Sequence, residues 1–274
     1  MAFSQAQDIE TRLDEIKSSM IDNNFETSLK QCEALLESGV SDTTQLALLY
    51  GYTGLSNEVL GNKMEAISYY QKAVELQFPQ LDIYDKLIAL SKKEKLDSIY
   101  EFALLEKLKA FPEYNQEITK SLAYLYVNTK QYEKLLSSTN QLLEWYPENV
   151  NYLYFKGIAL ENLTQVEEAK KFYKETLKFD AGHVGANMSL GMILYKEGSE
   201  IFASEKKKYE SKAKPDRVDY LNYNKGIEAG KNIYKEALPC LLKAYESGSY
   251  PALKQVLFNT YVRLEQKDKA EAYR

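Results

Sequence analysis

The stretch Val150–Asp180, VNYLYFKGIALENLTQVEEAKKFYKETLKFD, contains two short amphipathic segments joined by Leu-Thr-Gln. In the first segment, Leu153, Gly157 and Leu160 recur at helical spacing. The second segment repeats this spacing with Ala169, Phe172, Tyr173, Thr176 and Leu177. Residues three and four apart share one helix face, so each segment carries an apolar stripe. Because neither segment buries its stripe alone, the stretch predicts two helices packed against each other.

The pattern returns along the chain when the small residue that opens the second helix is used as a marker. The clear markers are Ala66, Ala169, Ala237 and Ala270, and the less typical ones are Ser28, Ser98 and Leu135. Neighbouring markers lie 32 to 38 residues apart, except for the interval of 68 residues between Ala169 and Ala237. A helix-turn-helix unit that recurs about every 34 residues resembles the tetratricopeptide repeat (TPR).

This resemblance implies an all-α fold, a right-handed superhelical TPR solenoid of about seven repeats in a single array over 1–274. The resemblance is strong at 44–79, 116–182 and 250–274, and weak at 5–40 and 80–112. In its repeat pattern the chain looks like bacterial TPR proteins of the Bacteroidetes type, many of which are exported. The expected repeats are 5–40, 44–79, 80–112, 116–147, 150–182, 184–247 and 250–274.

The double-length interval contains an insertion at 199–232, which is either a degenerate repeat or an extended helical hairpin. We favour the hairpin, with a first helix running to about Lys212 and a second returning to Glu246. Lys-Pro-Asp at 214–216 suits the turn, because Pro215 belongs in a turn or at the start of a helix. Across the hairpin, apolar residues are expected to pair, namely Ile201, Phe202 and Tyr209 with Tyr220, Tyr223 and Ile227.

Composition narrows the class of protein. Hydrophobic residues make up 45% of the 274, which excludes wholesale disorder, and the 12 Gly and 6 Pro are few for a β-sandwich. A net charge of -5 gives no overall electrostatic case for nucleic acid or anionic membranes. No run of about 18 apolar residues occurs, so we expect no membrane span.

Two further features bear on location. Ser4-Gln5-Ala6 has the small–x–small form found before a signal-peptidase site, although no charged and apolar regions precede it. A signal-peptide remnant would place the protein in the periplasm or outside the cell, whereas an ordinary polar N-terminus favours the cytoplasm. Cys32 and Cys240 lie in apolar stripes near opposite ends of the chain, so we expect two separate thiols.

The sequence offers little for catalysis. His183 is the single histidine, and a loop histidine of this kind is expected to be solvated or to cap a helix. The sequence has neither a His/Cys cluster with metal-ligand spacing nor a Gly-rich phosphate loop. We therefore expect no enzyme activity, no metal and no cofactor.

Binding is the expected chemistry, because the first helices of stacked TPRs line a concave groove that takes peptides or partner helices. Its tyrosines and methionines either contact a partner or pack between repeats. Transferring the groove positions of the family repeat by repeat gives Lys120, Tyr124, Asn128, Tyr154, Ile158, Glu161, Asn162, Met188, Met192, Tyr195, Gln255, Asn259 and Arg263.

Other kinds of partner fit the sequence less well. The chaperone-tail clamp of some TPR domains is not rebuilt here, because its positions at Leu48–Leu55 are mostly apolar. The basic run Lys206–Lys208, extended by Lys212, Lys214 and Arg217, is offset by neighbouring Glu and Asp and reads as a solvated hairpin tip. Homo-oligomerisation through the hairpin or the C-terminal Ala-Glu-Ala-Tyr-Arg, and a role as the repeat portion of a larger sensor or enzyme, remain alternatives.

Overall fold

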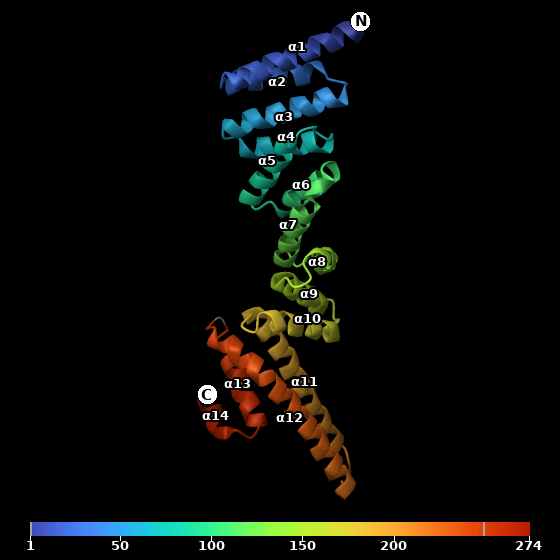
Figure 1. Ribbon diagram of the computed structural model, residues 1–274, viewed down its shortest axis with the longest axis vertical. Coiled ribbons are helices and arrows are strands. Elements are labelled where there is room, and N and C mark those ends of the chain that lie inside the picture. Colours follow the sequence, from blue (N-terminus) through green and yellow to red (C-terminus); the bar gives the residue numbers. More distant parts are fainter. Residues whose placement is uncertain (1, 249) are drawn as a thin grey trace. The chain divides into compact units, whose positions relative to one another are not determined.

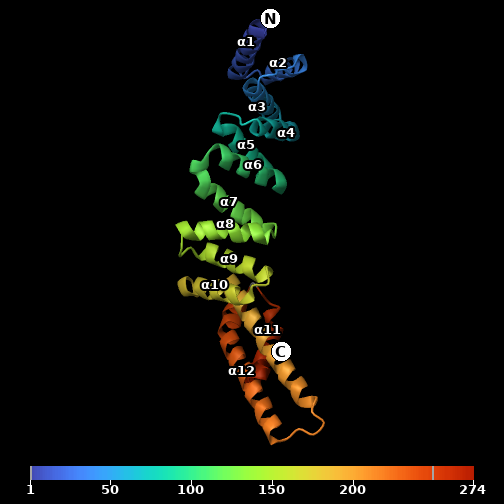
Figure 2. The same ribbon diagram turned by 90° about the vertical axis from the view of Figure 1, so that its right-hand side faces the viewer.

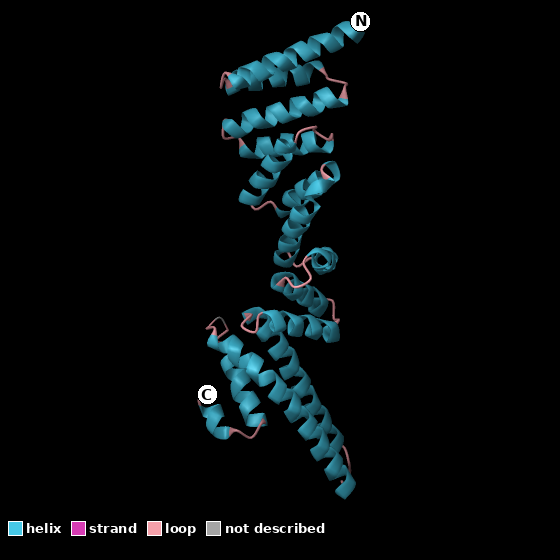
Figure 3. Ribbon diagram, viewed as in Figure 1, coloured by secondary structure: helices cyan, strands magenta, loops and turns pink. Residues whose placement is uncertain are grey.

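A computed structural model describes residues 2–248 and 250–274, with side chains described from residue 8 onward. Over these residues the secondary structure is helical, without strands (Figure 3). This confirms the all-α prediction. The chain divides into two compact units, Met1–Thr129 (unit 1) and Lys130–Arg274 (unit 2). Each unit is described by itself.

Unit 1 is a stack of antiparallel helix pairs (Figure 1). One core cluster joins the first pair to the helix that follows, through residues such as Ile16, Leu35 and Leu49. A second cluster, which includes Tyr70, continues through the next two pairs. The helices are α1 Ala2–Ile21, α2 Phe25–Ser38, α3 Thr43–Val59, α4 Lys63–Glu75, α5 Leu81–Lys93, α6 Asp97–Ala110, the 3-10 turn η1 Pro112–Tyr114, and α7 Asn115–Asn128.

Unit 2 continues with helices of similar length until the long α11–α12 pair. Its core cluster contains Leu160, Tyr173, Leu190, Leu241 and Leu257. The helices are α8 Tyr132–Trp145, α9 Val150–Asn162, α10 Val166–Phe179, α11 Val184–Glu210, α12 Arg217–Glu246, α13 Leu253–Arg263 and α14 Lys267–Glu271.

One turn recurs inside the helix pairs. A residue with positive φ follows the first helix, and the next residue donates its N–H to a carbonyl five positions back, as in Gln165 N to Leu160 O at 2.9 Å. This is a helix C-terminal motif that satisfies an otherwise free carbonyl. The positive-φ residues of this turn are Asn23, Gly61, Lys95, Thr164 and Glu265, and Lys130 after α7 also has a positive φ.

The position of the recurring turn shows that the predicted marker of the third pair, Ser98, is misplaced. Counting five residues on from the positive-φ residue reaches the buried markers Ser28, Ala66, Leu135, Ala169 and Ala270. In the third pair the same count from Lys95 reaches Tyr100, which is buried, whereas the predicted marker Ser98 is exposed. The prediction was wrong because a small residue was required at a position that here holds a tyrosine.

Both units contain the same close contact between a glycine of the first helix in a pair and a tyrosine ring of the second helix. A Cβ on Gly157 would lie 2.5 Å from the ring of Tyr173, and a Cβ on Gly54 would lie 2.5 Å from the ring of Tyr70. Both tyrosine rings are fully buried. The predicted small residue in the first helix is therefore required by the aromatic ring of the second helix, which lies directly against its backbone.

The long pair confirms the extended hairpin (Figure 2). The first helix, α11, ends at Glu210, and α12 runs from Arg217 to Glu246, close to the predicted bounds. The turn between them holds Pro215, and Asp216 and Asp219 form a capping box at the start of α12. Tyr209 packs on Tyr223 with ring centroids 5.0 Å apart, as the predicted aromatic pairing requires.

Within the hairpin, the other predicted apolar residues of α11 pack against the backbone of Gly230 in α12. Ile201 and Phe202 lie against Gly230, where a Cβ would come within 2.6 Å of the Phe202 ring. Phe202 also packs edge-on against Tyr234, with centroids 5.6 Å apart. The hairpin therefore has its own aromatic seam along its length.

The two cysteines are both free, with Cys32 buried and Cys240 half-buried. Burial raises the pKa of the Cys32 thiol to about 11. The expectation of two separate thiols is confirmed. Ser4-Gln5-Ala6 lie in α1, and their side chains are outside the described ones.

Candidate functional site

The predicted groove residues all lie on first helices of the pairs, here called A helices. In unit 1 they are on α7, and in unit 2 on α9, α11 and α13. Lys120, Tyr124 and Asn128 of α7 line one groove of about 560 Å³. Its other walls come from the α5–α6 turn, with Lys92, Lys95, Asp97 and Tyr100 among them, and from other residues of α7. The structure thus brings the three predicted residues of unit 1 together.

The unit 1 groove is rich in lysine. The ammonium of Lys92 lies 5.8 Å from the centroid of the Tyr100 ring. Lys95 and Lys120 are exposed and carry no carboxylate partner among the described residues. Asp97 and Glu117 supply negative charge on the same walls. This groove therefore presents both signs of charge beside an aromatic ring.

In unit 2, Tyr154 is held firmly at the start of the predicted surface. Its ring centroid lies 4.5 Å from that of His183 and 5.9 Å from that of Tyr173. The backbone of Gly185 approaches so closely that a Cβ there would overlap the Tyr154 hydroxyl. Burial raises the pKa of Tyr154. Tyr154 thus joins α9 to the beginning of α11.

His183 confirms the capping role expected of a lone loop histidine. Its Nδ1 accepts a hydrogen bond from Ala186 N at 3.1 Å, so the ring caps the N-terminus of α11. Burial lowers the pKa of His183, which favours the neutral imidazole that this acceptor role needs.

Glu161 serves the fold as well as the predicted surface. Its Oε2 accepts a hydrogen bond from the Tyr173 hydroxyl at 2.5 Å. Burial and this carboxylate raise the pKa of Tyr173 well above its usual range. The matching pair in unit 1, Tyr70 and Glu58, is joined in the same way at 2.6 Å. Asn162 is exposed, and its Nδ2 donates to Ile158 O of its own helix at 2.9 Å.

Predicted residues of the sixth and seventh repeats meet each other. The Asn259 Nδ2 donates to the Tyr195 hydroxyl at 3.2 Å, and Gln255 Nε2 donates to Asn259 Oδ1 at 3.1 Å. The guanidinium of Arg263 lies 4.9 Å from the centroid of the Phe202 ring. Met188 and Met192 are half-buried and pack on the core of unit 2. We use the name unit 2 A-face for the surface formed by the predicted groove residues Tyr154, Ile158, Asn162, Met188, Met192, Tyr195, Gln255, Asn259 and Arg263.

The sequence did not predict a bay of about 940 Å³ on another side of α11. It lies between the α9–α10 turn and the part of α11 that continues beyond ordinary A-helix length. Of the predicted groove residues, Glu161 alone lines it. Its charges are largely paired, since Lys170 contacts Glu167 at 2.8 Å and Glu197 at 2.6 Å. The double-length interval in the marker spacing was the signal for this bay, because the extension of α11 forms one wall.

Metal-binding clusters and membrane-spanning helices are both absent from the part of the chain that the structure describes. No three His, Cys, Asp or Glu side chains gather there in a way that would hold a metal ion. Among the same residues, no helix is both long and apolar enough for a membrane crossing.

Comparisons with known proteins give one family match and several distant relatives. The family model for the tetratricopeptide repeat matches residues 150–183. Protein O-mannosyl-transferase TMTC3 of Homo sapiens is 26% identical over 149 residues, which is 54% of this chain. The chain spans only 16% of that relative's length.

Among solved structures, a Bacteroides ovatus protein is 19% identical with a TM-score of 0.49, over 81% of this chain and 98% of its own. MamA from Desulfovibrio magneticus is 13% identical with a TM-score of 0.41, over 72% of this chain and 98% of its own. The match at 150–183 identifies a tetratricopeptide repeat in that stretch, and the same kind of turn and helix pair recurs in both units. Stacked repeats of this kind serve as protein-interaction scaffolds.

Proposed function

We propose that the protein is a non-catalytic scaffold whose unit 2 A-face binds a peptide or a short helix of a partner protein. The observation that carries this proposal is the row of half-buried apolar side chains on two consecutive A helices. Tyr154 and Ile158 belong to α9, and Met188, Met192 and Tyr195 belong to α11. A side chain that is anchored on one side and open on the other contacts a ligand without losing much conformational freedom.

The chemistry of this row suits a peptide. Methionine adapts to irregular apolar surfaces, and tyrosine combines a large apolar ring with a hydroxyl. Around the row, Asn162, Gln255 and Arg263 are exposed. They offer amide and guanidinium groups for the backbone carbonyls and acidic side chains of a bound segment.

The choice of variants follows from the packing. Tyr154 lies against His183 and Tyr173, so Tyr154→Ala is expected to lower stability as well as binding. Met192 and Asn162 are better probes, because Met192 is only half-buried and Asn162 is exposed. Lys171 and Lys178, exposed on α10, provide a matched control pair away from the A-face.

The test is selection of binding peptides from a displayed random library, followed by affinity measurement with purified protein. Met192→Ala with Asn162→Ala is expected to weaken the selected peptides about tenfold or more, since interface hot spots contribute on the order of 2 kcal/mol. Lys171→Ala with Lys178→Ala is expected to leave affinity unchanged. Peptides that bind the two double variants equally well would refute the A-face.

The bay between α10 and α11 is the second candidate for the same function. If the selected peptides are lost with Lys196→Ala and Glu200→Ala, both of which line the bay, the binding surface moves there. Self-association is separated from both by sedimentation of the protein alone, in which a monomer at the concentrations of the binding assay is expected.

A further inference from the structure

The tip of the α11–α12 hairpin has two different faces. Tyr220 and Tyr223 of α12 turn toward α11 and pack on Tyr209, with ring centroids 6.4 and 5.0 Å away. Val218 and Leu221 lie on the opposite side of the same helix turns and are 61% and 55% exposed. Two aliphatic side chains therefore project into solvent beside each other at the tip.

The basic residues of the tip fall into two groups. Three are neutralised by neighbouring carboxylates, Lys206 by Glu210 at 3.7 Å, Lys208 by Glu205 at 2.5 Å and Lys212 by Asp219 at 3.5 Å. The others are exposed and have no carboxylate partner among the described residues. These are Lys207, Lys214, Arg217 and Lys225.

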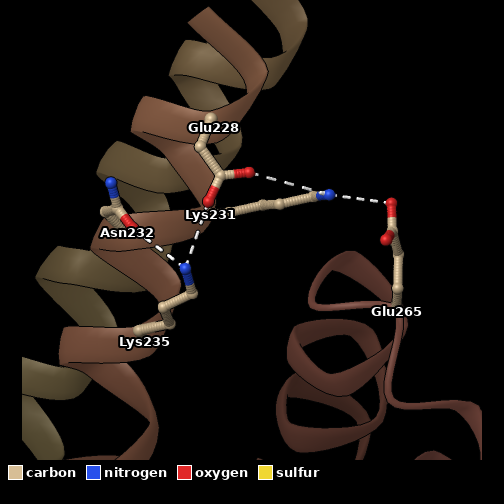
Figure 4. Close-up of polar contacts among 5 residues, drawn as sticks. All are labelled: Glu228, Lys231, Asn232, Lys235 and Glu265. Carbon is tan, nitrogen blue, oxygen red and sulfur yellow. Dashed lines mark hydrogen bonds and ion pairs between the residues drawn. The ribbon is translucent and has the colours of Figure 1, made fainter. Parts of the chain in front are cut away.

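Further along α12 the cations are paired (Figure 4). Glu228 contacts Lys231 at 3.9 Å and Lys235 at 3.1 Å, and Lys231 also reaches Glu265 of the α13–α14 turn at 2.8 Å. Ion pairing thus holds the middle of α12 to the last helix pair, whereas free positive charge collects at the tip. On α12, Arg217, Val218, Leu221 and Lys225 share one helix face.

We propose that this tip docks peripherally on an anionic lipid surface. Val218 and Leu221 enter the boundary between headgroups and acyl chains, and Lys214, Arg217 and Lys225 contact lipid phosphates. The net charge of the whole chain is -5, so the unpaired cations beside the two exposed aliphatic side chains of the tip set the orientation of docking.

The shape of the tip favours lipid over a folded protein partner. A stable protein interface buries roughly 1,000 Å² or more, and two protruding aliphatic side chains on a helix end cover far less. A lipid surface yields around protruding side chains and needs no matching pocket. The hairpin also has the reach, because α11 and α12 have 27 and 30 residues, against 13 and 14 in α9 and α10.

The test is co-sedimentation of the whole chain with vesicles of phosphatidylcholine, alone or mixed with phosphatidylglycerol. Binding is expected only to the mixed vesicles, and it weakens as salt is added. Lys214→Gln with Arg217→Gln is expected to lower the partition coefficient about thirtyfold, since each basic residue near an anionic surface contributes on the order of 1 kcal/mol. Val218→Ser with Leu221→Ser is expected to lower it at least about tenfold.

Matched controls exist elsewhere in the chain. Lys267→Gln with Lys269→Gln removes two exposed cations from α14, and Val59→Ser with Met64→Ser removes two apolar side chains that are 58% and 56% exposed. Both controls are expected to bind as the unchanged chain does. Circular dichroism confirms that every variant keeps its helices.

Three results would overturn the proposal. They are no binding to the mixed vesicles at low salt, tip variants that bind as tightly as the controls, and binding to phosphatidylcholine alone that ignores the tip. Tip-dependent binding of a poly-glutamate peptide or an oligonucleotide without vesicle binding would also reject lipid, and would name an acidic protein or a nucleic acid as the ligand instead.

Discussion

Two neighbouring helix pairs of unit 2, α9–α10 and α11–α12, bury a tyrosine of the second helix against a glycine of the first, but with different tightness. A Cβ on Gly157 would lie 2.5 Å from Tyr173, whereas a Cβ on Gly198 would lie 3.2 Å from Tyr234. The Tyr173 hydroxyl bonds to the carboxylate of Glu161, and that of Tyr234 to the hydroxyl of Ser199 at 2.7 Å. The ordinary repeat packs Tyr173 closely and gives it a charged hydrogen bond, whereas the long pair packs Tyr234 less closely at Gly198 and gives it a neutral one.

The insertion changed both the packing of the long pair and the surfaces around it. Once the pair no longer ends at the standard turn, its contacts spread along a longer seam that includes Phe202 and Gly230. The same extension forms one wall of the bay beside α10 and carries the exposed tip. Repeat packing is therefore retained where the turn is retained, and new surfaces arise where it is not.

The largest expected difference in stability is between alanine substitutions at the two glycines, Gly157 and Gly198. Gly157→Ala is expected to destabilise the protein by about 2–3 kcal/mol, because the new methyl overlaps the fully buried ring of Tyr173. Gly198→Ala is expected to change stability by less than about 1 kcal/mol, because the gain in helix propensity offsets a milder contact. Urea unfolding followed by circular dichroism measures both. Equal losses would remove the distinction between the pairs.

The tyrosine hydroxyls give the next effect. Tyr173→Phe removes a hydrogen bond to a carboxylate and is expected to cost about 1.5–2 kcal/mol. Tyr234→Phe removes a bond between neutral hydroxyls and is expected to cost about 1 kcal/mol or less. The same unfolding experiment applies. A larger loss for Tyr234→Phe would contradict the assignment of the charged bond to the ordinary repeat.

The pH dependence of stability at alkaline pH gives a further test of the Tyr173 hydroxyl. The pKa of Tyr173 in the folded protein is raised by burial and Glu161, so the folded state keeps a proton that the unfolded state loses above about pH 10. Stability from this group is complete below about pH 10 and falls as pH rises, by about 1 kcal/mol at about pH 10.5. Stability of Tyr173→Phe is expected to fall less steeply between about pH 9 and about pH 10.5 than that of the unchanged chain. Parallel curves would show that the two states release the proton together.

The smallest effect concerns helix caps. Asn149 accepts hydrogen bonds from Asn151 N and Tyr152 N at the start of α9, and Asp216 accepts one from Asp219 N at the start of α12. Asn149→Ala is expected to cost about 1 kcal/mol globally. Asp216→Ala is expected to lower global stability by less than about 0.5 kcal/mol, because the hairpin tip opens locally. Hydrogen exchange would then speed up mainly at 205–225, and faster exchange throughout unit 2 would show that the tip is not a separate folding unit.

Much of the fold is predictable from the sequence because it depends on local pattern. The Gly157–Ala169–Tyr173 spacing predicts one packed pair, and Pro215 predicts the hairpin turn. The recurring positive-φ turn is not predictable, since it is occupied by residues as different as Lys95, Thr164 and Gly61. That variability is why the marker of the third pair was misplaced by two residues, at Ser98 instead of Tyr100.

The candidate site is less predictable, because it depends on contacts between pairs. The sequence places Tyr154, Met192 and Tyr195 on A helices, but not the contact of Tyr154 with His183. The double-length interval in the repeat spacing signals the extension of α11, but not the residues of α9 and α10 that complete the bay beside it. The position of a residue in the repeat predicts the helix face on which it lies. The length of the neighbouring helix decides how much of that face stays exposed.

The central claim is that partner proteins bind to the A-face of unit 2. Its most direct test is site-specific photo-crosslinking in the source cell, with benzoylphenylalanine placed at Met192 on the A-face, at Glu200 in the bay, or at Lys171 on α10. A discrete protein adduct is expected from position 192 and none from position 171. Adducts from position 200 or 171 with none from position 192 would contradict it.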